Sequence, residues 1–179
     1  MYKTADDSRI QISELMLPSF ANFGGKIHGG YILGLMDQIA FACASKHSRS
    51  YCVTASVNKV DFLNPIEVGE LVTMKASVNY VGKSSMVVGI RVESENIQTG
   101  LKKHCNSSYF TMVAVDKLGK TVTVPGLILT TKMDAKRFIK SIIRRESDAK
   151  RSKDLEGLYK NVEDHLEQLK DYRVKIDFK

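Results

Sequence analysis

The segment from residue 29 to residue 47 constrains the fold most, because apolar side chains cover most of its circumference when it is drawn as a helix. A helix that is apolar on nearly all sides is buried inside a domain. The segment opens with the pair Gly29 and Gly30, and Asp37 is the one acidic residue among its apolar positions. The rest of the chain therefore has to supply elements that wrap this helix.

Segments with alternating apolar and polar side chains follow the helix. Such alternation predicts strands that are wet on one face. Turn residues between the segments favour antiparallel hairpins. One buried helix with an antiparallel sheet around it gives an α+β fold. The four long strand candidates and the one short candidate are residues 52–63, 70–81, 85–96, 101–115 and 9–17.

The start of the predicted helix has the chemistry of an anion-binding site. Backbone N–H groups at a helix start lack intrahelical partners, and the helix dipole adds partial positive charge there. Gly29 and Gly30 add no side chain, so a carbonyl oxygen can approach these N–H groups as in an oxyanion hole. Asp37 is open to two interpretations. It acts on a substrate as nucleophile or general base, or it is a helix-face acid paired with a surface cation.

These residues carry a family resemblance. Asn22, then glycine, then His28-Gly29-Gly30 and then Asp37 resemble the pattern of the hot-dog-fold acyl-CoA thioester hydrolases. Stretches at residues 53–57, 60–70 and 80–86 resemble the same family in the same order, and the similarity covers about residues 8 to 118. It implies a hot-dog fold, in which an antiparallel sheet wraps one long central helix. It also implies hydrolysis of acyl-CoA thioesters to free CoA and a carboxylic acid, with no cofactor, since coenzyme A is part of the substrate.

The resemblance also implies roles for individual residues. Asp37 attacks the thioester or activates water, the amides near Gly29 and Gly30 hold the oxyanion, and Asn22 and Thr54 position groups. Alternatives stay open for three residues. Asn22 is otherwise a loop-capping residue, and Thr54 is otherwise a strand residue without a role in the site. His28 either lines the site or holds the start of the helix.

Residues 82–85 resemble the turn that holds the nucleotide end of coenzyme A. The turn consists of Gly82, Lys83, Ser84 and Ser85. Backbone amides, hydroxyls and an ammonium group suit phosphate. The alternative is an ordinary hairpin turn with a solvated lysine.

The spacing of Gly30 and Asp37 predicts a dimer. Seven residues of helix separate them by about 10 Å along the axis, too far for both to serve one thioester carbonyl. If both act on one carbonyl, they come from different chains, in a homodimer with two shared sites and an isologous interface. The resemblance implies such dimers, often assembled as trimers of dimers.

Pro125-Gly126 predicts a boundary between a thioesterase domain, residues 1–125, and a helical, basic extension, residues 126–179. Residues 132–153 contain nine Lys or Arg and three acids, so they carry nine minus three, or +6, of the chain's net charge of +7. Three interpretations stay open: contact with the CoA 3′-phosphate of a neighbouring subunit, a solvated face, or contact with RNA or anionic lipid. Few aromatic residues stand among the cations, which disfavours nucleic acid.

Other classes receive less support. The cysteines Cys43, Cys52 and Cys105 lie in apolar or strand-like contexts and are expected to be buried, and the histidines lack the spacing of a metal site. No apolar run reaches about 18 residues and no apolar signal segment opens the chain, so we expect a cytoplasmic protein. The main alternative function is a non-catalytic acyl-CoA-binding sensor on the same fold, which usually lacks the acid. A hot-dog dehydratase would need a catalytic His in other motifs.

Overall fold

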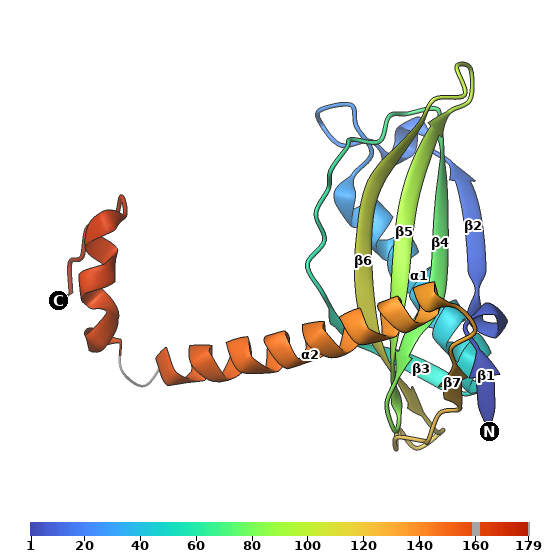
Figure 1. Cartoon of the computed structure of the whole chain (residues 1–179). Coiled ribbons are helices and arrows are strands. Elements are labelled where there is room, and N and C mark those ends of the chain that lie inside the picture. The colour runs from blue at the N-terminus through green and yellow to red at the C-terminus, as the bar shows by residue number, and fades with distance from the viewer. Residues whose placement is uncertain (159–161, 179) are drawn as a thin grey trace. The chain divides into compact units, whose positions relative to one another are not determined.

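A computed structural model describes residues 1–158 and 162–178 of the chain (Figure 1). The chain divides into two compact units, Met1–Phe138 and Ile139–Lys179. The first unit contains the long helix α1 (Gly29–Ser48) and an antiparallel five-stranded sheet with the strand order β2-β4-β5-β6-β3. The strands are β2 (Ile10–Leu15), β3 (Tyr51–Val57), β4 (Glu70–Val81), β5 (Ser85–Asn96) and β6 (Lys102–Val115).

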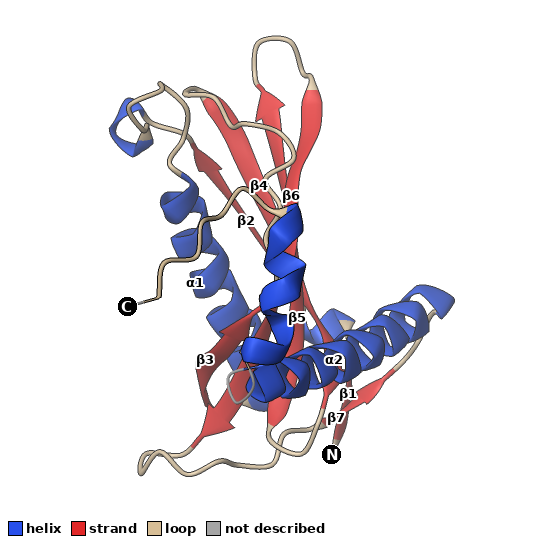
Figure 2. Ribbon diagram, turned by 90° about the vertical axis from the view of Figure 1, so that its left-hand side faces the viewer, coloured by secondary structure: helices blue, strands red, loops and turns tan. Residues whose placement is uncertain are grey.

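The sheet curls around α1, which lies along its concave face (Figure 2). The even-numbered apolar residues of β4, among them Met74 and Val78, are buried, as the alternation predicts. They pack in one core cluster with Met36 and Ile39 of α1 and Phe110 of β6. The predicted α+β arrangement of one helix wrapped by an antiparallel sheet is confirmed.

Two details differ from the sequence prediction. Strand β3 ends at Val57 instead of continuing to residue 63. Beyond it the chain leaves the ladder and is held by single hydrogen bonds, such as Leu63 N–H to the Cys105 carbonyl (2.9 Å). Helix α1 is also not enclosed on all sides, because Asp37 and Phe41 are exposed next to the edge strand β3.

A second, two-stranded sheet joins the two ends of the first unit. Strands β1 (Tyr2–Thr4) and β7 (Gly126–Ile128) pair in parallel. The buried His47 ring holds the same region, with Nε2 3.0 Å from the Pro125 carbonyl, and burial lowers the pKa of this imidazole. The domain boundary expected at Pro125-Gly126 stays a prediction.

Helix α2 (Lys132–Leu158) contains the basic segment. Thr131 and Asp134 form a reciprocal cap at its start, in which the Asp134 N–H donates to Thr131 Oγ1 and Thr131 N–H donates to Asp134 Oδ2 (both 3.1 Å). The short 3₁₀ helices are η1 (Asp6–Ser8), η2 (Pro18–Phe20) and η3 (Glu163–Asp171).

The ion pairs of Glu93 predict a pH-dependent contribution to stability. Lys75 Nζ (2.7 Å) and Arg91 Nε (2.8 Å) donate to this carboxylate and lower its pKa from 4.5 to about 2. Ionised Glu93 therefore stabilises the fold above pH 4.5, and this contribution disappears as the pH falls towards 2. We expect Glu93→Gln to lower the free energy of unfolding by ~1 kcal/mol at pH 6, measured by denaturant titration.

The difference between wild type and Glu93→Gln should shrink as the pH falls from 4.5 to 2.5. Glu95→Gln serves as the control, because Glu95 pairs with a single cation, Lys102, at 3.2 Å. A difference that stays constant across this pH range would contradict the assignment.

Candidate active site

The loop before α1 is organised by Asn22. Its Oδ1 accepts hydrogen bonds from the N–H groups of Gly24 (2.9 Å) and Lys26 (3.2 Å). Gly25 completes the turn with φ +75°, a conformation that favours glycine. In the structure the Asn22 side chain therefore caps this loop, which is the alternative that the sequence leaves open. Its role in the site stays a prediction.

His28 is the N-cap residue of α1. The Gly30 N–H donates to His28 Nδ1 at 2.9 Å, and the Tyr31 N–H donates to the His28 carbonyl at 3.0 Å. Within the described residues, no acceptor is found for the Gly29 N–H. Two amides were expected to hold an oxyanion. The Gly30 N–H already donates to His28 in its own chain, whereas the Gly29 N–H is available to a substrate oxygen.

Phe62 lies against the start of α1 and was not singled out from the sequence. A Cβ atom placed on Gly29 would be 3.2 Å from Phe62 Cζ, so the ring lies directly over this glycine. Phe62 stands in one of the stretches that carries the family resemblance, and this was the signal available in the sequence.

Asp37 and Thr54 meet on the open side of α1. The Thr54 hydroxyl donates to Asp37 Oδ1 at 2.6 Å and also lies 3.5 Å from the sulfur of Met112. Thr54 immediately precedes a β-bulge in β3, and bulges re-aim side chains. The carboxylate and the hydroxyl open into a hollow of about 470 Å³, lined by Asp37, Gln38, Phe41, Tyr51, Cys52, Val53 and Thr54.

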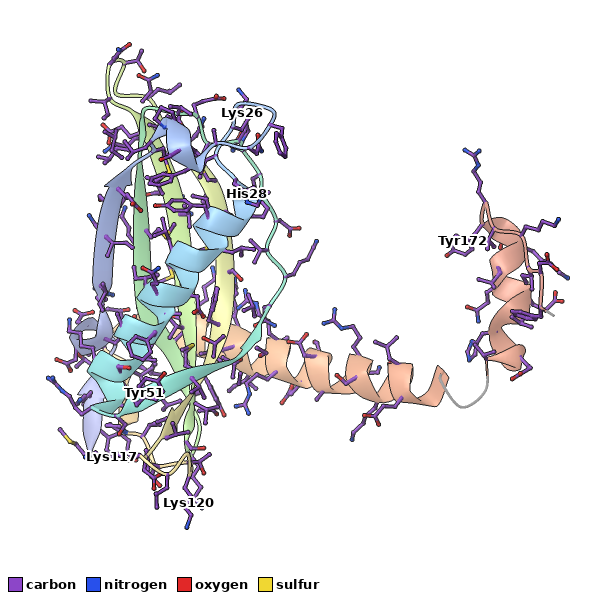
Figure 3. The ribbon with its side chains drawn as sticks, turned by 180° about the vertical axis from the view of Figure 1, so that it is seen from behind. Lys26, His28, Tyr51, Lys117, Lys120 and Tyr172 are labelled. Carbon is purple, nitrogen blue, oxygen red and sulfur yellow. The ribbon has the colours of Figure 1, made fainter. Side chains whose placement is uncertain are left out.

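The helix-start loop and the Asp37–Thr54 pair form two separate clusters in one chain. Figure 3 shows Lys26 and His28 at one end of α1 and Tyr51, which lines the Asp37 hollow, towards the other. No hydrogen bond or ion pair among the described residues joins Asn22 or His28 to Asp37. This separation agrees with the distance of about 10 Å expected from the helical rise.

The turn at residues 82–85 joins β4 to β5. The Gly82 N–H donates to the Ser85 carbonyl (2.7 Å), and the carbonyls of Ser84 and Lys83 accept from the N–H groups of Ala114 (2.9 Å) and Val124 (3.0 Å). The Lys83 side chain is exposed. A rigidly held turn with an exposed ammonium group is able to bind a phosphate.

The described residues also show where the cysteines lie and whether a metal site or a membrane-spanning helix is present. The three cysteines are buried thiols, and desolvation raises the pKa of Cys43 to about 12. Within residues 1–158 and 162–178, no group of three His, Cys, Asp or Glu side chains could hold a metal ion. In the same residues, no helix has the length and apolarity needed to cross a membrane.

Comparisons with known proteins identify the family. The model of the thioesterase superfamily matches residues 24–101. Protein VdlD of Helicobacter pylori is 43% identical over 143 residues, which cover 80% of this chain and 82% of that protein. The uncharacterized acyl-CoA thioester hydrolase YkhA of Bacillus subtilis is 35% identical, over 70% of this chain and 73% of that protein. The chain belongs to the acyl-CoA thioester hydrolase family.

Solved structures of acyl-CoA thioesterases have the same fold. A hexameric acyl-CoA thioesterase, solved without ligand, superposes with a TM-score of 0.82 and 36% identity, over 84% of this chain and 97% of that one. The acyl-CoA hydrolase from Staphylococcus aureus, solved with butyryl-CoA, CoA and CoA disulfide, has a TM-score of 0.81 and 28% identity, over 90% and 99% of the two chains. The hot-dog fold is thereby confirmed, as is membership of a thioesterase family.

The cap formed by His28 generates a prediction about stability. His28→Ala removes the acceptor of the Gly30 N–H, so we expect the free energy of unfolding to fall by ~1 kcal/mol. His28→Asn keeps an acceptor and should retain most of this stability. Denaturant unfolding of both variants checks the assignment, and equal loss in the two variants would contradict it.

Proposed function

We propose that this chain hydrolyses acyl-CoA thioesters with Asp37 as the catalytic carboxylate. The observation that carries the proposal is the 2.6 Å hydrogen bond from Thr54 Oγ1 to Asp37 Oδ1. It holds one carboxylate oxygen in a fixed orientation and leaves the other for water or for the thioester carbon. The hydroxyl and the carboxylate open into a hollow bordered by apolar side chains, which suits an acyl thioester.

The spacing of the polar residues supports this assignment. The Staphylococcus aureus hydrolase has also been solved as Asp-to-Ala, Asn-to-Ala and Thr-to-Ala variants. In that protein the Asn precedes the Asp by 43 − 28 = 15 residues and the Thr follows it by 60 − 43 = 17 residues. Asn22, Asp37 and Thr54 have the same separations, 37 − 22 = 15 and 54 − 37 = 17.

The active site combines two chains. The face of α1 that carries Asp37 is exposed, and the neighbouring edge strand β3 exposes Tyr51, Val53 and Val57. A two-fold contact on this surface would bury these residues. It would also bring the start of the partner's α1 to Asp37. The partner then supplies the Gly29 amide for the oxyanion, with Asn22 shaping the loop that positions it.

The turn of residues 82–85 binds the nucleotide end of coenzyme A. Ser85 pairs with Val113, and Val113 pairs with Val53, which lines the Asp37 hollow. Ser85 of the turn and Val53 are therefore two strand spacings apart, which is about 10 Å. Lys83 contributes the positive charge, and the backbone hydrogen bonds of the turn fix its shape. Two similar thioesterases are hexamers. The proposal therefore includes a hexamer assembled from three such dimers.

Substitution of Asp37 tests the chemistry. Asp37→Asn preserves the shape of the side chain and its ability to accept from Thr54, but it cannot attack or take a proton. We expect hydrolysis of acetyl-, hexanoyl- and palmitoyl-CoA to fall by about 10³-fold or more, measured by thiol release. Glu95→Gln, which removes a carboxylate that lies outside the Asp37 hollow, is the matched control. Binding of acyl-CoA with no hydrolysis in the wild type would favour the sensor instead.

Co-expression of two inactive variants tests the shared site. If one site uses Asn22 of one chain and Asp37 of the other, random dimers of Asn22→Ala and Asp37→Asn regain about a quarter of wild-type activity, since half are mixed and each has one intact site. Each variant expressed alone provides the baseline. Activity no higher than this baseline would argue for sites built within one chain.

Substitution of Lys83 tests the CoA turn. Lys83→Gln removes one charge-assisted contact to phosphate, so KM for acyl-CoA should rise about tenfold with kcat nearly unchanged. Lys117→Gln, in another exposed turn, is the matched control. A lower kcat with an unchanged KM would show that Lys83 acts elsewhere.

A further inference from the structure

The face of the sheet that points away from α1 contains a hollow that the thioesterase chemistry does not use. Its strand residues alternate with core residues, as Lys75 and Ser77 do with Ala76 and Val78. The hollow has a volume of about 590 Å³, within the size range of ligand pockets. It is lined by residues of β2, β4, β5, β6 and the start of α2, together with Arg9.

A β-bulge shapes the floor of this hollow. Asn79 is the extra residue in β4, because Val78 pairs with Val88 while Tyr80 pairs with Val87. Its side chain lies flat over Gly89, where an added Cβ would be 2.1 Å from Asn79 Nδ2. Bulges often re-aim a side chain beside a functional site. Here the bulge places the Asn79 amide at the floor of the hollow.

The amide of Asn79 is held in place at the floor of the hollow. The residue is 6% exposed, and its Oδ1 accepts from Ser77 Oγ at 3.1 Å. Asn79 is also one of the residues that line the hollow.

The rim of the hollow is cationic. Arg9, Lys75, Arg91 and Arg137 line it, and none of the described lining residues is acidic. The acids that pair with these cations stand outside the lining: Glu93 with Lys75 and Arg91, Asp6 with Arg9, and Asp134 near Arg9 and Arg137. The positive ends of these pairs therefore face the hollow, and guanidinium groups bind phosphate oxygens in pairs.

We propose that this hollow is a second ligand site, which binds a phosphorylated molecule of nucleotide size. The cations bind the phosphate, the Asn79 amide donates to a polar group, and the Tyr109 ring contacts a planar or apolar part. The proposal does not rest on the proposed hydrolysis, because Asp37 and Thr54 lie on the α1 side of the sheet.

Calorimetric titration with adenosine 5′-monophosphate tests this site in the intact protein. Wild type should bind it saturably and should bind uncharged adenosine much more weakly. Arg91→Gln removes one charged donor, so we expect about tenfold weaker affinity. Gly89→Ala puts a methyl group where the Asn79 amide lies and should weaken binding at least as much.

Two controls isolate the hollow from general effects of charge and from the thioester site. Lys102→Gln removes an exposed cation of the same sheet that lies outside the hollow, and it should bind the nucleotide like wild type. Asp37→Asn should also bind it like wild type, whatever its activity. No saturable binding by wild type, or equal affinity of Arg91→Gln and Lys102→Gln, would overturn the proposal.

Coenzyme A contains a nucleotide of the same chemistry, and competition separates the two sources. A free nucleotide is the ligand if saturating coenzyme A leaves the affinity for adenosine 5′-monophosphate unchanged. If coenzyme A displaces the probe from wild type and its own affinity falls in Gly89→Ala, the hollow binds the nucleotide end of coenzyme A. That result would contradict the role proposed for residues 82–85.

Discussion

The packing of one side of α1 against the concave face of the sheet determines where every proposed catalytic group lies. Met36, Ala40 and Cys43 are fully buried in this contact. Asp37 follows Met36 by one residue, or about 100° of helix rotation, and so it points away from the core. A five-stranded sheet covers only one side of a helix. The acid therefore stays on the open side, beside the edge strand β3, and in the proposed dimer a second chain encloses it.

Alternation predicted the strands that lie fully inside the sheet. The bounds of β4 and β5 follow from it because both strands have one buried face and end at tight turns. Strand β3 breaks the pattern at its bulge, and the residues after Val57 keep an apolar and polar mixture without pairing in the ladder. The parallel pair β1 and β7 was not predicted, because strands of three residues leave no periodic signal.

Some residues of the site could likewise be predicted from the sequence pattern, whereas other contacts are visible only in the structure. The family spacing predicted Asp37 and Thr54 as site residues, and in the structure they share a hydrogen bond. It did not predict that His28 would occupy the Gly30 amide, since that bond depends on one side-chain rotamer. The position of the Phe62 ring over Gly29 depends on the path of the chain after β3, which alternation does not predict, although the family stretch at residues 60–70 includes Phe62.

Strand parity keeps the two proposed sites on separate faces of one sheet. Along β4 and β5, residues of one parity fill the core beneath α1, and residues of the other parity reach the outer face. A polar residue on the outer face can therefore change without disturbing the packing that orients Asp37. The bulge at Asn79 is the exception, because it shifts parity within β4 and buries a polar side chain against Gly89. In the proposed second site this amide is one of the lining groups, together with Arg9, Lys75, Arg91 and Arg137.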